Sequence, residues 1–189
     1  MSTPARATSP RYDELLERAY AYALDNGLAD LSLRPLAAAI GSSPRVLLFL
    51  FGSKDGLVAA LLGRARADEL DHIASLQPVG RDLAATLQAT WDWLVAPAHR
   101  PLLTLWLEAY ARSLVDPDGP WGGFARQTVD DWLELLRRAQ PPRARRTRAG
   151  AAQRTLALAV LRGALLDLLA TGDVERTSSA VAQQVKVMR

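Results

Sequence analysis

Three basic side chains, Arg34, Arg45 and Lys54, stand in a stretch of sequence that holds no acidic residue. They are the only charged residues from Leu31 to Lys54, and the acids of this region come earlier in the chain. Arginine and lysine can pair with phosphates, and an arginine can also donate two hydrogen bonds to guanine. These residue types indicate a local site for nucleic acid, with an ordinary solvated surface as the alternative.

Side chains that could carry catalysis or hold a metal are scarce. The 189 residues include no cysteine and two histidines, His72 and His99. The lack of cysteine excludes a disulfide framework, iron–sulfur clusters and thiolate zinc sites, and two histidines cannot form a multi-histidine metal centre. We find no nucleophile–base pair and no glycine loop for phosphate. We therefore expect no enzyme activity, no catalytic residue, no metal and no cofactor.

The elements that must position the basic residues are short helices. Strand alternation with hairpin turns is missing, whereas apolar residues recur at helical spacing. A helix is predicted over 33–40, and Gly41 then supplies a tight turn. Ser43 as N-cap and Pro44 in the first turn begin the next helix, near 44–50. Ser53 precedes a long helix from Lys54 to about residue 76.

Helices 33–40 and 44–50 have the pattern of a helix-turn-helix. Apolar residues of both helices can pack inward while Arg45 points outward into a major groove. We predict an all-α fold with an N-terminal three-helix helix-turn-helix domain and a larger C-terminal antiparallel helical bundle. The first domain covers residues 1–56, with a flexible arm over 1–10 and the motif at about 33–52. The second covers 57–189 and is expected to bind a ligand and to dimerise.

From about Tyr12 to Leu57 the sequence resembles the TetR family of transcriptional regulators. The resemblance is carried by the following residues: Ala19, Gly27, Leu36-Ala37, Gly41, Ser43 and the run Phe51-Gly52-Ser53-Lys54-Asp55-Gly56-Leu57. It implies a homodimer that binds a palindromic operator in double-stranded DNA. It also implies a small-molecule pocket in the C-terminal domain whose occupancy changes the affinity for DNA.

The resemblance assigns roles at the DNA. Ser32 and Lys54 match positions that contact phosphate, and Ser43, Pro44 and Arg45 match the base-reading start of the recognition helix. The sequence departs from the family at Leu48, where tyrosine is usual, and at Arg45, where a small residue is common. The expected DNA-binding residues are Ser32, Arg34, Ser42, Ser43, Pro44, Arg45, Val46, Leu48, Phe49 and Lys54.

Aromatic residues of the C-terminal part suggest the effector site. Core packing is the default for tryptophan in a helical bundle, and a cavity bounded by aromatic rings is the alternative. Trp93 lies off the apolar stripe of its helix, and His72 and His99 are expected at the surface or at helix ends. We expect a hydrophobic or aromatic ligand to contact Trp91, Trp106, Glu108, Tyr110, Phe124, Thr128 and Trp132.

The segment Leu156–Leu169 is apolar on nearly all sides, so a helix there must be covered on several faces. We expect this helix and the one over 121–136 to form a four-helix dimer interface, with a monomer that buries the helix centrally as the alternative. The expected interface residues are Trp121, Ala125, Leu136, Ala157, Val160, Leu161, Ala164 and Leu168.

The net charge of +3 comes from one stretch, 137–148, which contains six arginines and is expected to be a disordered, solvated loop. The N-terminus lacks the apolar core of a signal peptide, and no long uncharged apolar run predicts a membrane span. We expect a cytoplasmic protein, a small-molecule-responsive repressor. The alternative function is a helical ligand carrier or interaction protein whose helix-turn-helix no longer binds DNA.

Overall fold

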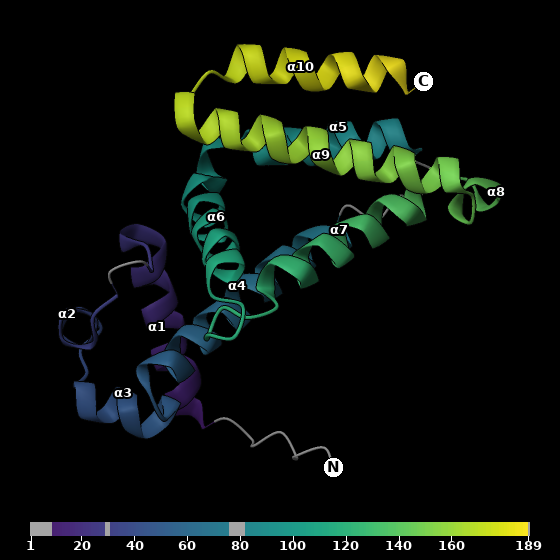
Figure 1. The fold of residues 1–189 in the computed structure, drawn as a ribbon. Helices are drawn as coiled ribbons and strands as arrows, with labels where there is room; N and C mark the ends of the chain where they lie inside the picture. Colours follow the sequence, from purple (N-terminus) through teal and green to yellow (C-terminus); the bar gives the residue numbers. More distant parts are fainter. Residues whose placement is uncertain (1–8, 29–30, 76–81, 189) are drawn as a thin grey trace. The chain divides into compact units, whose positions relative to one another are not determined.

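The structure, a computed structural model, describes residues 9–28, 31–75 and 82–188 (Figure 1). This part of the chain contains helices joined by turns and no strand, which confirms the predicted all-α fold. Residues 1–8 of the expected arm lie outside the described residues, as do residues 29–30, 76–81 and 189.

Four helices make up the N-terminal part: α1 (Pro10–Asn26), α2 (Leu33–Ala39), α3 (Pro44–Phe51) and α4 (Lys54–Ser75). Local signals fix their starts. The Ser9 hydroxyl accepts a hydrogen bond from the Tyr12 amide, and the Ser43 hydroxyl accepts one from the Val46 amide. A proline follows each of these serines in the first turn, where its missing N–H costs nothing.

The remaining helices are α5 (Leu83–Leu94), the 3-10 turn η1 (Pro97–His99), α6 (Arg100–Val115), α7 (Phe124–Ala139), α8 (Pro142–Arg145), α9 (Arg148–Thr171) and α10 (Val174–Val187). The sequence predicted a start at Trp121 for α7. The helix begins later, because Gly123 adopts a left-handed conformation with φ of 78° and interrupts the helical path.

The chain divides into two compact units, and each uses two separate stretches of sequence. Unit 1 combines Met1–Arg66 with Leu105–Gly122, and unit 2 combines Ala67–Thr104 with Gly123–Arg189. Helices α4 and α6 therefore each contribute residues to both units. The expected boundary at 56/57 separates a DNA-binding part from a ligand-binding part of the chain. This functional boundary stays a prediction.

The core of unit 1 is formed by the helices that carry the motif. Leu15, Ala19, Leu36 and Leu57, from α1, α2 and α4, are buried. Arg64 links α4 to α1, since its Nε lies 2.6 Å from Glu17 Oε1 and its guanidinium lies 4.9 Å from the centre of the Tyr20 ring. The start of α4 is thus held on α1 by packing and by charge.

Unit 2 is a helical bundle centred on α9, which contacts α5, α7, α8 and α10. The chain turns back after α9, so that α10 runs alongside it in the opposite direction (Figure 1). Leu87, Trp91, Leu136, Ala157 and Val181 lie fully inside this bundle, with exposed fractions of 1% or less. Their burial supplies the apolar contacts that hold the bundle together.

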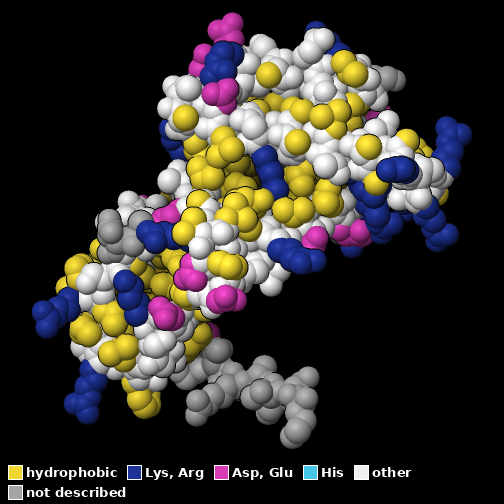
Figure 2. All heavy atoms as spheres, viewed as in Figure 1, with side chains coloured by type: hydrophobic (Ala, Val, Ile, Leu, Met, Phe, Trp, Pro, Cys, Tyr) yellow, Lys and Arg dark blue, Asp and Glu magenta, His cyan; other side chains and the backbone are white. Residues whose placement is uncertain are grey.

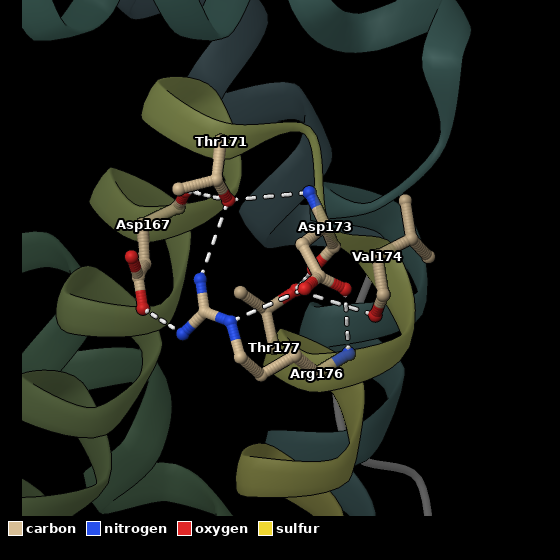
Figure 3. Close-up of polar contacts among 6 residues, drawn as sticks. All are labelled: Asp167, Thr171, Asp173, Val174, Arg176 and Thr177. Atoms are coloured by element: carbon tan, nitrogen blue, oxygen red, sulfur yellow. Dashed lines mark hydrogen bonds and ion pairs between the residues drawn. The ribbon is translucent and has the colours of Figure 1, made fainter.

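Arg176 fastens the corner between α9 and α10 (Figure 3). Its guanidinium bonds Asp167 Oδ2 on α9 at 2.6 Å and Asp173 Oδ2 at the start of α10 at 3.3 Å. Asp173 also caps α10 by accepting a hydrogen bond from the Arg176 amide. The hydrogen bond from Arg176 lowers the pKa of the Asp167 carboxyl.

The prediction of a disordered, solvated loop over the arginine cluster is wrong for several of its residues. Arg137 and Arg138 on α7 both pair with Glu134, and these hydrogen bonds lower the pKa of that carboxyl to about 2. Arg145, on the short α8, donates to the carbonyls of Gln140 and Arg138. The charges of these three arginines have local acceptors, which charge counting along the sequence does not reveal, whereas Arg143, Arg146 and Arg148 are exposed to solvent.

Candidate functional site

Helices α2 and α3 form a helix-turn-helix. Their axes are bent by 102° across the break at residues 40–43, within the range of about 90–120° typical of this motif. Gly41 has φ of 67°, and the Ser42 amide donates to the Ala37 carbonyl at 2.8 Å to close the turn. The predicted role of Gly41 in the tight turn agrees with this geometry.

The motif is anchored to α1 and to the start of α4. Arg18 of α1 donates to the carbonyl of Ile40 at 3.2 Å, directly before the turn. Phe51 at the end of α3 is buried, and its ring centre lies 4.6 Å from that of Tyr12. A Cβ atom at Gly56 would overlap the Phe51 carbonyl oxygen, so the corner from α3 to α4 requires glycine there. These contacts fix the orientation of α3.

The outer face of α3 combines one cation with three apolar side chains. Leu47 is buried, whereas Arg45, Val46, Leu48 and Phe49 are exposed. Arg45 and Phe49 are one helical turn apart, so they lie above one another on the side opposite the buried residues. The Ser43 hydroxyl oxygen accepts the cap bond from the Val46 amide and can still donate its own hydrogen, and Arg45 is the one charged side chain of α3.

The other predicted DNA-binding residues lie around this helix. Ser32 is exposed and stands at the N-cap of α2 without a side-chain cap bond, and Arg34 is exposed in the first turn. The Ser42 hydroxyl oxygen is buried and has no hydrogen-bond partner among the described residues, and Pro44 is half-buried. Lys54 is exposed and begins α4, whose N-terminal amides favour an anion such as phosphate.

The residues predicted to bind a ligand are divided between the units. In unit 2, Trp91, Phe124, Thr128 and Trp132 on α5 and α7 are buried. The Trp132 Nε1 donates to Glu69 Oε1 at 2.6 Å, and the hydroxyl of Thr128 has no hydrogen-bond partner among the described residues. A shared pocket with the residues of unit 1 stays a prediction.

In unit 1, Trp106, Glu108 and Tyr110 lie on α6. The rings of Trp106 and Tyr110 pack at a centroid distance of 5.1 Å. Glu108 has a structural partner, because its Oε2 accepts a hydrogen bond from the Leu28 amide at 2.8 Å. It therefore holds the segment that leads from α1 toward α2.

Sequence reasoning missed a polar and aromatic cluster in unit 2. Trp93 is stacked between His72 and His99, with ring-centroid distances of 3.7 Å and 4.1 Å, and His99 Nδ1 lies 2.8 Å from the Trp93 carbonyl oxygen. Burial, together with the charge of nearby His99, lowers the pKa of His72 to about 4. The only sequence signal was that Trp93 fell off its helix's apolar stripe. Its partners come from separate segments.

The predicted dimer residues require a correction. Leu136, Ala157, Leu161 and Leu168 are buried within a single chain, as are Trp121 and Ala125, so these side chains offer almost no free surface to a partner. Val160 and Ala164 are half-buried. The exposed side of α9 instead carries Leu156, Ala159, Gly163 and Leu166. Six of the eight predicted interface residues are thus buried within the single chain, and which face of α9 meets a second subunit stays a prediction.

The described residues form neither a metal-binding cluster nor a single membrane-spanning helix. Within the described ranges, no group of three or more histidine and carboxylate side chains is placed to hold a metal ion. No single described helix is long and apolar enough to cross a bilayer, and α2 and α3 reach the length and apolar composition of a span only when taken together as a bent pair.

The comparisons with known proteins identify the fold. By sequence, the chain matches no protein family and no curated protein. By structure, it is similar to a TetR-family regulator from Rhodococcus sp. (TM-score 0.73, 18% identity, 95% of this chain and 98% of the other). It is also similar to a TetR regulator from Haloarcula marismortui ATCC 43049 (TM-score 0.73, 18% identity, 93% and 95%).

A third similar structure is the multidrug binding protein EbrR complexed with imidazole (TM-score 0.68, 23% identity, 94% of this chain and 91% of the other). These likenesses extend over nearly the whole chain. The chain therefore has the fold of the TetR-family transcriptional regulators, with the N-terminal helix-turn-helix in its expected place.

Proposed function

We propose that this protein is a TetR-like transcriptional regulator that binds a palindromic DNA operator as a homodimer. The observation that carries the proposal is the helix-turn-helix of α2 and α3, bent by 102°, whose outer face presents Arg45. A recognition helix fixed in this way can enter a major groove while neighbouring cations contact phosphates. In the proposed division of labour, residues 1–56 bind DNA and residues 57–189 bind an effector and the second subunit.

The remaining predicted contacts fit this proposal. Arg34 and Lys54 are exposed near the two ends of the motif, and the described part of 31–54 contains no acidic side chain. Such a local positive surface attracts DNA by releasing counterions from its phosphates. Ser32, Ser43 and Pro44 are proposed to contact the DNA backbone and the edge of the groove, and the hydroxyl of Ser42, which is buried in the free protein, is proposed to turn outward to do so.

The dimer is proposed to form through the exposed side of α9. Leu156 and Leu166 are 52% and 48% exposed, and Ala159 and Gly163 lie between them along the helix. A Cβ atom added at Gly163 would meet nothing within 4 Å. Small residues between larger apolar ones allow two helices to approach closely, and a two-fold axis would bring the same stripe of each subunit together.

A small hydrophobic or aromatic effector is proposed to control DNA binding, and repression is the proposed outcome in its absence. The buried aromatic residues of unit 2 and the free hydroxyl of Thr128 support a site between α5 and α7, near the Glu69–Trp132 hydrogen bond. The similar protein EbrR binds imidazole. An effector would act by binding the DNA-incompetent state more tightly than the competent one.

The test is selection of random duplex DNA by the purified protein, followed by sequencing. We expect a palindrome whose half-sites are about one helical turn apart, because a dimer reads successive major grooves. Arg45→Ala should weaken binding to the selected duplex and relax its selectivity. If no duplex is enriched even at low salt, the proposal fails in favour of a helical carrier or interaction protein.

A further inference from the structure

The outer face of α3 is unusually apolar for a helix that is exposed to water. Phe49 is 83% exposed, Leu48 41% and Val46 37%. Scattered apolar residues on a surface need no explanation, but three exposed ones on an eight-residue helix, with Val46 and Leu48 flanking Phe49, form a patch. The patch does not serve the core, since Leu47 and Phe51 on the opposite side already pack α3 against the rest of unit 1.

The charges around the patch select the kind of partner. Arg34, Arg45 and Lys54 are all exposed, and no acidic side chain lies between Leu31 and Lys54. Figure 2 shows hydrophobic side chains at the surface of unit 1, with Lys and Arg side chains projecting beside them. An anionic partner with apolar groups in reach of α3 satisfies both features. The edge of DNA bases in the major groove has one such group, the C5 methyl of thymine.

We infer that α3 recognises thymine through this methyl group, with Phe49 as the main contact and Val46 and Leu48 beside it. This inference rests on the proposed function. Arg45, on the same side of α3 as Phe49, recognises a guanine by donating two hydrogen bonds to it. Specificity in each half-site is thus divided between one charged contact and an apolar surface.

The helix geometry sets a spacing for these contacts. Arg45 and Phe49 are separated by about 6 Å along the helix axis, from four residues at about 1.5 Å each. Base pairs follow one another at about 3.4 Å. Because a recognition helix lies along the groove at an angle to the duplex axis, the guanine read by Arg45 and the thymine read by Phe49 lie within a few base pairs of one another in the half-site.

The experiment uses the full chain and the duplex enriched by the selection described above. Each thymidine of that duplex is replaced in turn by deoxyuridine, which removes only the methyl group, and the Kd is measured at constant salt. One thymine in each half-site should be sensitive, with affinity falling about fourfold per methyl, as expected for burial of about one methylene equivalent. For Phe49→Ala the same replacement should change the affinity less than twofold.

Two variants serve as controls. Val115 on α6 is also 83% exposed, so Val115→Ala removes a side chain of equal exposure outside α3 and should keep the wild-type response to deoxyuridine. Arg45→Ala should lose preference for the guanine and keep its sensitivity to the methyl. Circular dichroism checks that each variant is folded, which the exposure of Phe49 favours.

The outcomes separate this inference from the proposed function. Failure to enrich any duplex overturns both. Enrichment of a palindrome whose affinity is unchanged by every deoxyuridine replacement, or changed equally in wild type and Phe49→Ala, overturns only the reading of thymine. Phe49-dependent binding to vesicles of phosphatidylserine and phosphatidylcholine, without a methyl effect on DNA, overturns it in favour of a membrane surface.

Discussion

At the residue scale, the carboxylate of Glu108 holds the backbone after α1 through a single hydrogen bond. Its Oε2 accepts from the Leu28 amide, and its Oε1 is buried without a hydrogen-bond partner among the described residues. Glu108→Ala leaves the Leu28 amide without this acceptor, and we expect a loss of about 1–3 kcal/mol in the stability of unit 1. Hydrogen exchange at the Leu28 amide should accelerate, and thermal unfolding should shift to lower temperature.

The control for this prediction is Glu108→Gln, which keeps an acceptor oxygen of nearly the same shape. It should slow exchange at Leu28 back toward the wild-type rate. Unchanged exchange in Glu108→Ala would show that the bond contributes nothing to the order of this segment. A ligand-anchoring role alone would leave the exchange rate of the free protein unaffected.

His72 makes the stability of the protein depend on pH in a defined window. Burial against Trp93 lowers its pKa from 6.5 to about 4, so the folded state keeps the ring neutral. As the pH falls from about 6.5 to 4, the unfolded chain binds a proton that the folded chain does not, and stability is lost. Because the ring is only partly buried, we expect a loss of about 1–2 kcal/mol rather than the full linkage value.

Denaturant unfolding at pH 7.5, 6.0 and 4.5 measures this effect. His72→Phe preserves an aromatic ring beside Trp93 and cannot be protonated, so its stability should vary less over this range. Glu134, whose pKa is lowered from 4.5 to about 2, stabilises the folded state above pH 4.5 and loses this contribution as the pH falls from about 4.5 to 2, so its effect lies mostly below the measured range. Equal pH dependence of wild type and His72→Phe would refute the assignment.

At the residue scale, the sequence was informative where a role depends on local spacing. The outward position of Arg45 follows from the phase of one short helix with a capping serine, whereas Val46, one of the apolar residues expected to pack inward, is exposed. The bond of Glu108 could not be foreseen, because Leu28 lies 80 positions away and nothing along the chain marks the pair. The stack of His72, Trp93 and His99 was missed for the same reason.

At the scale of elements, α9 determines how two chains can meet. Its free face carries Leu166, which is 48% exposed. Leu166→Glu places two charges in the proposed dimer contact, where burial of an unpaired charge is unfavourable. We expect this variant to be monomeric at micromolar concentration, whereas the wild type is a dimer, as measured by analytical ultracentrifugation.

Leu70→Glu is the matched control, because Leu70 on α4 is 40% exposed and lies outside the proposed interface. It should remain dimeric. If Leu166→Glu also remains dimeric, the interface uses another surface. Far-ultraviolet circular dichroism should be the same for both variants, since neither position is in the core.

The elements themselves were largely predictable, because capping residues, prolines and glycines act locally. Ser43 with Pro44, and Ser53 before Lys54, mark helix starts that the structure reproduces. The free face of α9 was not predictable, because a helix that is apolar on nearly all sides has no periodicity to show which side faces the core. Contacts with α5, α7 and α10 determine that side.

At the scale of the whole molecule, two helices rather than one join the compact units. Both α4 and α6 supply residues to unit 1 and to unit 2. Helix α4 leads directly from the helix-turn-helix into unit 2. Because Glu108 on α6 bonds the segment between α1 and α2, a displacement of α6 would also reach the helix-turn-helix. Communication through both helices follows from the same proposal of an effector-driven population shift.

The operator spacing tests the molecule as a dimer. Two rigidly connected recognition helices bind half-sites about 34 Å, or about 10 base pairs, apart on one face of the duplex. Inserting five base pairs at the centre of the selected palindrome rotates one half-site by about half a turn, and we expect affinity to fall to that of random DNA. Inserting ten base pairs returns both half-sites to the same face of the duplex but leaves them farther apart than the two recognition helices. A rigid dimer should therefore still bind weakly.

Leu166→Glu makes this prediction specific. A monomer occupies each half-site independently, so its weaker affinity should not change when five or ten base pairs are inserted. A wild-type protein that tolerates both insertions would contradict a fixed dimer, even if it recognises the half-site correctly. Dependence on spacing in the wild type, together with its absence in the variant, would connect the free face of α9 to the reading of DNA by α3.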